Sequence, residues 1–383
     1  MKNIYFDHAA TTYIKDEVLE KMLPYLGKYF ENPSSIYFNA IKTKKAIEDS
    51  RSKIAKALNC ERKEIYFTSS ATESNNWALK GLAFANKKKG NHIITTKIEH
   101  PSILESCYYL EQLGFKITYL PVDEYGLISL KDLENAITDK TILISIMFAN
   151  NEIGTIQPIK QIGEIAERKK IYFHTDAVQA VGKLPINLKE YKIDMLTLSG
   201  HKIYGPKGIG ALFIKDGVNI ENFIHGGSQE NGMRAGTENV ANCVGLGYAL
   251  ELATKNIKDK MHNLTLLRDK LITTAQLNIG CCKLNGHPTE RLSNNINLSI
   301  RGVNGKKLVE SLDKCGIKCS SGSACSCGSR KPSHVLLSLG LPEQLAIESI
   351  RITLGDNTTI DEIDYFIEQL IQITNDLRIA HNK

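Results

Sequence analysis

The sequence has no hydrophobic run long enough to cross a membrane and no apolar leader at its start. The longest apolar stretch, Ile142–Phe148, has the length of a strand, and Met1–His8 contains nothing that resembles a signal peptide. We therefore expect a cytoplasmic protein. Cysteines are normally reduced in that compartment, so the nine cysteines are expected to be thiols rather than a disulfide framework.

Concentrated charge and low-complexity segments are also missing. Lys and Arg total 48, Asp and Glu total 42, and the difference of +6 is spread along the chain. Nucleic-acid-binding proteins usually gather basic residues on one face or in one tail, so direct binding of nucleic acid is not expected. Hydrophobic content of 42% and charged content of 23% are ordinary for a globular protein. The 383 residues predict one large domain and one smaller domain.

Apolar segments of strand length recur between residues 65 and 215, separated by helical or turn segments. They are rich in Ile and other β-branched residues, which is typical of a mostly parallel sheet with both faces covered by helices. An α/β fold with a seven-stranded sheet is therefore predicted. The predicted strands are Ile65–Ser69, His92–Thr96, Lys116–Pro121, Ile142–Phe148, Ile171–Thr175, Asp194–Ser199 and Ile209–Ile214.

The pattern changes beyond a Lys- and Leu-rich stretch, residues 255–271, which predicts a long connecting helix. Short apolar segments and a final amphipathic segment then describe a second, α+β domain. We predict a larger domain over residues 13–255 and a smaller one formed by residues 1–12 and 256–383. Its expected elements are strands at Asn295–Ser299 and Ser349–Leu354 and a helix marked by Ile363, Phe366, Ile367 and Leu370.

Polar residues that follow predicted strands are candidates for chemistry, because parallel strands deliver their carboxyl ends to a ligand crevice. Lys202, in a Gly-rich turn, can form a Schiff base. Asp176 can pair with a pyridinium nitrogen or cap a helix. His100 can stack on a cofactor ring and shuttle protons, or lie solvated in its loop. The residues alone leave these alternatives open.

Two loops could hold an anion. Ser69–Asn75 leads from a strand into a helix, where free N–H groups suit a phosphate, although an ordinary N-cap by Ser70 or Thr72 is the commoner arrangement. Thr237 lies in a Gly-rich loop beside Arg234.

Four cysteines near the end of the chain have the spacing C-x3-C-x5-C-x-C, which matches neither zinc sites nor common ferredoxin runs. We therefore expect no metal site formed by this chain alone. Cys325 lies among Gly and Ser residues, which predicts an exposed, mobile loop where a thiolate can act. Cys315 and Cys319 are expected to be ordinary residues of the second domain.

Taken in order, segments over nearly the whole chain resemble the cysteine desulfurases of the NifS/IscS type, which are pyridoxal 5'-phosphate (PLP) enzymes of fold type I. The matching segments are Asp7–Thr12, Ser70–Asn75, Glu99–His100, Asn150–Gly154, Asp176–Gln179, Ser199–Lys202, Arg234–Thr237, Ser321–Cys325 and Arg351–Gly355.

The resemblance implies an α/β PLP-dependent transferase fold, with PLP in the larger domain and the cysteine loop in the smaller. It implies a homodimeric enzyme that converts L-cysteine to L-alanine and forms a persulfide on Cys325. The sulfur would pass to acceptors such as an iron–sulfur scaffold or a tRNA-thiolation enzyme, for iron–sulfur cluster assembly or tRNA and cofactor thiolation. No membrane partner is implied.

The resemblance also implies a role for each site residue. Lys202 would carry PLP and move protons, His100 would stack on the ring, and Cys325 would be the nucleophile. Arg351 would bind the substrate carboxylate, a task that suits a planar guanidinium, and Asn151 would lie by the ring oxygen and also bind substrate. Thr237 would reach the phosphate of the other subunit. The expected cofactor-binding residues are Ala71, Thr72, His100, Asn151, Asp176, Gln179, Ser199, His201, Lys202 and Thr237.

Two departures from the family pattern surround the expected nucleophile. Cys327 stands two residues beyond it, and Arg330-Lys331-Pro332 replaces a more acidic segment. Cys327 could relay sulfur, trap Cys325 in a disulfide or help to bind a metal, and Cys325 itself can ligate a cluster jointly with a scaffold partner. Rival interpretations are a selenocysteine lyase on the same scaffold and a sulfur or metal carrier that holds no PLP.

Overall fold

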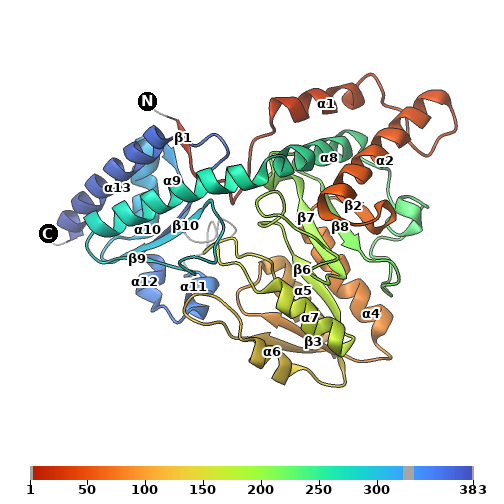
Figure 1. The fold of residues 1–383 in the computed structure, drawn as a ribbon, viewed down its shortest axis with the longest axis horizontal. Helices are drawn as coiled ribbons and strands as arrows, with labels where there is room; N and C mark the ends of the chain where they lie inside the picture. The colour runs from red at the N-terminus through yellow and green to blue at the C-terminus, as the bar shows by residue number, and fades with distance from the viewer. Residues whose placement is uncertain (1–2, 322–331, 382–383) are drawn as a thin grey trace.

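A computed structural model describes residues 3–321 and 332–381 of the chain (Figure 1). Its dominant element is a seven-stranded sheet with the order β2-β8-β7-β6-β5-β3-β4. Every pair in it is parallel except those of β8, which is antiparallel to both of its neighbours. The strands are β2 (Ile65–Thr68), β3 (His92–Thr96), β4 (Lys116–Leu120), β5 (Thr141–Ser145), β6 (Tyr172–Asp176), β7 (Met195–Ser199) and β8 (Gly210–Ile214).

Both faces of this sheet are buried, which explains why its strands read as continuous apolar runs. Ile93 packs into one hydrophobic cluster and its neighbour Ile94 into another, and Met195 and Leu196 divide in the same way. Successive side chains of a strand point to opposite faces, so the two clusters mark the two faces. One face is covered by α2 (Phe38–Leu58), α7 (Ile159–Lys169) and α8 (Val240–Thr254), the other by α3 (Ala71–Asn76), the π-helical turn Trp77–Gly81, α4 (Leu82–Asn86) and α5 (Pro101–Gln112).

A second, three-stranded antiparallel sheet has the order β12-β10-β9 and its own hydrophobic cluster. The start of the chain belongs with it, because β1 pairs in parallel with β11. Both labelled termini lie on this side of the molecule in Figure 1. The elements of this part are β1 (Ile4–Tyr5), α9 (Ile257–Asn278), β9 (Cys282–Leu284), β10 (Asn295–Ile300), α10 (Gly305–Lys314), β11 (Ile317–Lys318), β12 (Ser349–Thr353) and α13 (Ile360–His381).

We call the seven strands with their covering helices the large-sheet region, and β1 and β9–β12 with α9, α10 and α13 the small-sheet region. Figure 1 shows α9 running from beside α8 across to the small sheet. The remaining helices are α1 (Asp16–Leu26), α6 (Leu130–Ala136), α11 (His334–Ser338) and α12 (Glu343–Ile347). Within the described residues, none of the helices combines the length and the apolar composition that crossing a membrane would need.

The predicted α/β class and the mostly parallel seven-stranded sheet are confirmed. Each predicted strand is present, with ends that differ by a few residues. Three short strands, β1, β9 and β11, were not predicted. Each has only two or three residues, too few for an alternating pattern to be recognised.

Candidate active site

One edge of the large sheet collects most of the predicted site residues. β3, β5, β6 and β7 run in parallel, and β2 points the same way as β7 because β8 is antiparallel to both. Their carboxyl ends therefore meet at one edge, the usual position of a ligand crevice in such sheets. Asp176 ends β6, Gly200–Lys202 follows β7, and His100 lies four residues beyond β3.

A chain of buried hydrogen bonds joins Asp176 to His100. Asn75 donates through Nδ2 to Oδ2 of Asp176 at 2.7 Å and to Oγ of Ser102 at 2.8 Å. Oγ of Ser102 lies 2.9 Å from Nδ1 of His100, and the backbone N–H of Val178 donates to the other Asp176 oxygen at 3.0 Å. Both carboxylate oxygens are thus held by donors, which fixes the direction that the carboxylate faces.

His100 is the N-cap of α5 and partly buried, so the alternative of a solvated loop residue is wrong. Burial lowers its pKa; the Asp176 carboxylate raises it and the Lys202 charge lowers it. The ring therefore favours its neutral form at neutral pH. A neutral imidazole beside both a carboxylate and a lysine can stack on an aromatic ring or exchange a proton.

Lys202 reaches across to the start of the chain. Its amine donates to the carbonyl oxygens of Ala9 and Ala10, each at 2.6 Å. Thr12 also holds the N-terminal segment against the turn that carries Lys202. Its N–H donates to the His201 carbonyl at 2.9 Å, and its hydroxyl accepts from the Tyr204 N–H at 2.8 Å. The N-terminal segment therefore determines where the Lys202 amine lies.

The start of α3 offers the candidate phosphate cradle. Ser70 is its N-cap and accepts from the Glu73 N–H at 3.2 Å, so this part of the N-cap alternative is correct. Gly210 packs tightly beneath: a Cβ there would lie 2.8 Å from the Ser70 carbonyl carbon and 3.0 Å from the Ala71 nitrogen. Ala71 and Thr72 occupy the first turn, where N–H groups are free to meet an anion.

His201 and Ser199 come from the turn that carries Lys202. Burial, together with the charges of Lys202, Lys207 and Lys183, lowers the pKa of His201 to about 4. His201 is thus neutral at pH 7, and its Nδ1 lies 3.1 Å from the Thr11 hydroxyl. The buried Ser199 ends β7.

The sequence suggested that the loop of Arg234 and Thr237 could hold an anion. In the structure, Arg234 binds a carboxylate of the chain itself. Its guanidinium binds both carboxylate oxygens of Glu73, at 2.8 and 3.1 Å. Burial would raise the pKa of Glu73, but hydrogen bonds from Arg234 and Ser69 hold it below its ordinary value. This ion pair draws the Thr237 loop towards the start of α3, and Thr237 itself is exposed.

Arg351 approaches from the small sheet, in the middle of β12, and is 1% exposed. Its Nη2 donates to Oδ1 of Asp7 at 2.7 Å and its Nη1 to the Asn151 carbonyl at 3.3 Å. Among the described residues, no acceptor reaches its buried Nε. Arg351 therefore links the small sheet to the loop after β5, with unused hydrogen-bonding capacity.

Gln179 lies in the turn after β6 and is buried. Its Nε2 donates to the Ala9 carbonyl at 3.1 Å, the same oxygen that Lys202 contacts. The structure thus brings together the predicted lysine, carboxylate, histidine and amide.

These groups fit PLP. The helix start above Gly210 suits a phosphate, Asp176 suits a pyridinium nitrogen, and Lys202 suits a covalent link to an aldehyde. Sequence reasoning missed Asn75 and Ser102, which connect Asp176 to His100. The signal was present, since Asn75 lies on the first helical turns after β2 and Ser102 directly follows His100 and Pro101.

The cysteine cluster is only partly described. Cys315 is partly buried and Cys319 is buried, and burial raises the pKa of Cys319 to about 12. A thiol of this kind packs as an apolar group. Cys325 and Cys327 lie outside the described residues. In the part of the chain that the structure describes, no group of three His, Cys, Asp or Glu side chains could hold a metal ion.

Comparisons with known proteins agree with this arrangement. Residues 4–366 match the aminotransferase class-V family. The chain is 55% identical to "Cysteine desulfurase IscS" of Clostridium botulinum, over 98% of this chain and 96% of that protein. It is 54% identical to the protein of the same name from Methanosarcina thermophila, over 98% of this chain and 93% of the other.

Solved structures give the same result. A structure described as a NifS-like protein has 38% sequence identity and a TM-score of 0.93, covering 98% of this chain and all of that one. "SspA in complex with cysteine" has 40% identity and a TM-score of 0.82, covering 93% of this chain and all of that one. The chain belongs to the aminotransferase class-V family and, within it, to the cysteine desulfurases.

Proposed function

We propose that the protein is a PLP-dependent cysteine desulfurase that converts L-cysteine to L-alanine and takes up the sulfur as a persulfide on Cys325. One observation carries the proposal: Lys202, Asp176 and His100 meet at one sheet edge, and Arg351 contacts the neighbouring Asn151 loop. The names of the relatives, which include IscS proteins and a cysteine complex, support the same substrate.

The large-sheet region binds the cofactor in this proposal. When bound, PLP supplies an electron sink for the negative charge that develops at the substrate α-carbon. Asp176, oriented by Asn75 and the Val178 N–H, would pair with the ring nitrogen. His100 would stack on the ring, and Asn151 and Gln179 would lie by the ring oxygen. Ala71, Thr72, Ser199 and His201 would hold the phosphate.

The small-sheet region binds the substrate. Arg351 already donates to Asp7 and to the Asn151 carbonyl, so its side chain is oriented before cysteine arrives. A substrate carboxylate would take up the remaining donors, including the unpaired Nε. Preorganised donors of this kind are stronger than flexible ones, because little ordering remains to be done on binding.

Proton and sulfur transfer complete the reaction. Lys202 would remove the α-proton and return protons to the substrate, and neutral His100 is placed to assist. The Cys325 thiolate would attack the substrate sulfur, and the carbon–sulfur bond would break to leave alanine. Cys327 would modulate the onward transfer without being needed to form the persulfide.

A homodimer completes the phosphate site in this proposal. Thr237 is exposed in the single chain, and we infer that it reaches the phosphate of the other subunit. Large apolar side chains lie exposed around the start of α2, with Phe30 77%, Ile36 95% and Phe38 72% exposed. Such a concentration is typical of a surface that another chain covers.

We infer the following division and setting for the whole protein. Residues 13–255 form the cofactor domain, and residues 1–12 and 256–383 form the domain that carries Cys325.

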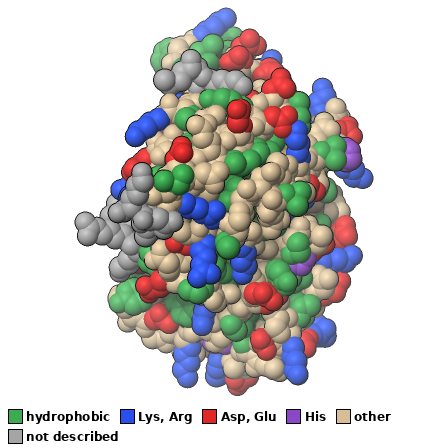
Figure 2. Space-filling model, turned by 90° about the vertical axis from the view of Figure 1, so that its left-hand side faces the viewer, with side chains coloured by type: hydrophobic (Ala, Val, Ile, Leu, Met, Phe, Trp, Pro, Cys, Tyr) green, Lys and Arg blue, Asp and Glu red, His purple; other side chains and the backbone are tan. Residues whose placement is uncertain are grey.

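Figure 2 shows one face of the molecule, with apolar side chains scattered among charged ones. The protein would work in the cytoplasm and pass sulfur to acceptor proteins for iron–sulfur clusters or thiolated tRNA, with Cys325 able to share a cluster with a scaffold.

The test is alanine formation from cysteine, with reductant present, by wild type and Cys325→Ser. We expect alanine from wild type only. Cys281→Ser is the matched control, because Cys281 is exposed directly before β9, which lies at the opposite edge of the small sheet from β12, and the change should leave the rate unchanged. Alanine from both proteins would place the nucleophile elsewhere, and alanine from neither would contradict the proposed function.

A further inference from the structure

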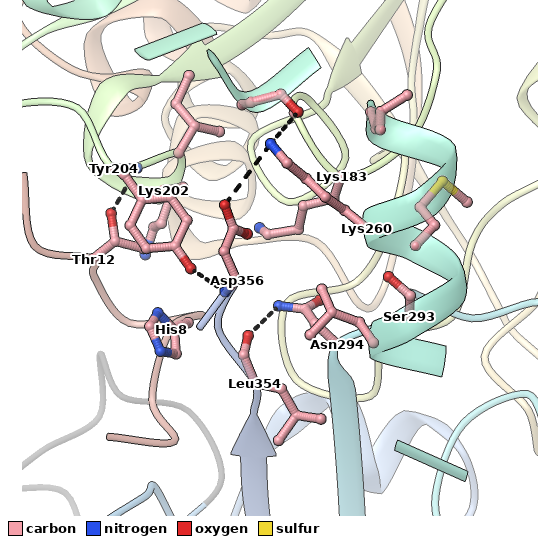
Figure 3. Close-up of a pocket in the computed structure, with 16 residues that line it drawn as sticks. His8, Thr12, Lys183, Lys202, Tyr204, Lys260, Ser293, Asn294, Leu354 and Asp356 are labelled. Atoms are coloured by element: carbon pink, nitrogen blue, oxygen red, sulfur yellow. Dashed lines mark hydrogen bonds and ion pairs between the residues drawn. The ribbon is translucent and has the colours of Figure 1, made fainter. Parts of the chain in front are cut away.

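Lys183 is a lysine near the site to which the proposed reaction gives no role. It lies in the turn after β6 and lines a cavity of about 30 Å³ that Lys202 also lines (Figure 3). A water molecule needs roughly 10–15 Å³ measured in this way, so the cavity has room for only a few. Lys183 is partly buried and therefore lies in a narrow space rather than in bulk solvent.

Hydrogen bonds connect Lys183 to the Lys202 amine through one side chain. Nζ of Lys183 donates to Oε1 of Gln179 at 3.0 Å and to the Gln179 carbonyl at 3.3 Å. Nε2 of Gln179 donates to the Ala9 carbonyl at 3.1 Å, and that oxygen accepts from Lys202 at 2.6 Å. The four residues form a continuous chain.

This chain determines which way the Gln179 amide faces. An ammonium group has only donors and a carbonyl oxygen only accepts. The amide oxygen must therefore face Lys183 and the amide nitrogen must face Ala9. Without Lys183, no other donor among the described residues would reach this oxygen, and the amide would be held by the Ala9 carbonyl alone.

Lys183 also brings a charge to the cavity. Burial and, to a smaller extent, the Lys202 charge lower its pKa to about 7, and the Asp356 carboxylate opposes this change. Asp356 is shared, because Lys15 contacts its carboxylate at 2.6 Å and Lys260 at 3.9 Å. The charged and titratable groups that face Lys183 from the surrounding elements are His8, His201, Lys202, Tyr204, Lys260 and Asp356.

We propose that Lys183 is a positioning residue of the cofactor site, which fixes the amide of Gln179 and places a second positive charge beside Lys202. The inference rests on the proposed function, since Gln179 and Lys202 contact the cofactor there. A nearby positive charge disfavours protonation. In its ammonium form Lys183 therefore lowers the pH at which the cofactor linked to Lys202 loses its proton.

The experiment is a pH titration of the visible absorption of the PLP-loaded protein. In Lys183→Met, which loses both donor and charge, the midpoint should rise by about one pH unit and PLP should bind about five- to tenfold more weakly. Lys183→Gln retains a donor for Gln179 without the charge. It should show the same rise in midpoint but bind PLP within about twofold of wild type.

Two further variants make the result decisive. Lys260→Met removes another cavity lysine, one that donates to the Leu252 and Ala253 carbonyls instead of Gln179, and should leave the midpoint near the wild-type value. In a Gln179→Leu background, Lys183→Met should no longer weaken PLP binding, because the two residues act as a pair.

An unchanged midpoint in both Lys183 variants would overturn the inference, as would an equal rise in Lys260→Met. Failure of the proposed function has a different signature. Wild-type protein would then show no PLP absorption band, or Lys202→Ala would retain it unchanged.

Discussion

At the edge of the large sheet, site residues leave the ends of several strands and are joined by hydrogen bonds from Asp176 to His100. The small sheet contributes Arg351 from within β12, and the guanidinium of Arg351 donates to Asp7 and to the Asn151 carbonyl. The residues at the edge of the large sheet form a connected network, whereas Arg351 is a single side chain held from two sides. Substitutions at the site in the large-sheet region should therefore change the absorption spectrum and reactivity of the bound cofactor. Substitution of Arg351 should change substrate binding alone.

The largest effect is expected for Lys202→Ala. Removing the amine removes both the covalent link to PLP and the group that moves protons, so alanine formation should fall by about 10⁴-fold or more. The visible band of the linked cofactor should vanish. Lys207→Ala, a change at an exposed lysine in the same turn, is the control and should retain both activity and spectrum.

Asp176→Asn should have the next largest effect. The amide keeps the shape of the carboxylate but cannot hold the ring nitrogen in its protonated form, so kcat should fall by about 10²- to 10³-fold. PLP should remain bound with an altered spectrum. A change confined to KM, with kcat and spectrum unchanged, would contradict the division between the two sheets.

Arg351→Lys should raise KM for cysteine by about 10- to 100-fold, because an ammonium cannot reproduce the planar contacts to a carboxylate. The spectrum of the bound cofactor should be unchanged before substrate is added. Arg301→Lys, at an exposed arginine of the small-sheet region, is the matched control. An altered resting spectrum in Arg351→Lys would mean that the small sheet also shapes the cofactor site.

The last effect concerns stability rather than activity and lies beside His100. Glu99 is fully buried, its Oε1 accepts from Thr96 and the Met147 N–H, and its Oε2 has no partner among the described residues. Burial raises its pKa to about 8 from the ordinary 4.5. The folded protein thus keeps a proton that the unfolded chain releases between these values, so the unfolding free energy falls as pH rises through this window.

In wild type, Glu99 should lower the unfolding free energy by on the order of 2–4 kcal/mol between about pH 5 and pH 8.5, and Glu99→Gln should remove this fall. Urea unfolding of the cofactor-free protein at both pH values measures it. Glu105→Gln, at an exposed residue of α5, should leave the pH dependence as in wild type. If the unfolding free energy changed with pH by the same amount in Glu99→Gln and in wild type, Glu99 would not hold the extra proton.

The sequence predicted the placement of Lys202 and Asp176 because Asp176 lies at the end of a buried strand and Lys202 in the turn after one. The apolar pattern of a strand can be recognised without knowing which strands lie beside it. It could not predict what their side chains contact. Ala9 and Lys202 are 193 residues apart, and Asn75 and Asp176 are 101 residues apart. Such contacts follow from the order of the strands, which hydrophobic patterning does not encode. The antiparallel direction of β8 was missed for the same reason.

The crossing of the N-terminal segment has a consequence for biosynthesis. Ile4 and Tyr5 leave the ribosome long before Ile317 and Lys318, the residues with which they pair. The carbonyls of Ala9 and Ala10, which accept from the Lys202 amine, lie a few residues beyond this pairing in the chain. Contacts so distant in sequence form late in folding. A nascent chain that ends before Ile317 lacks this pairing, and we expect it to retain PLP less well than the longer chain.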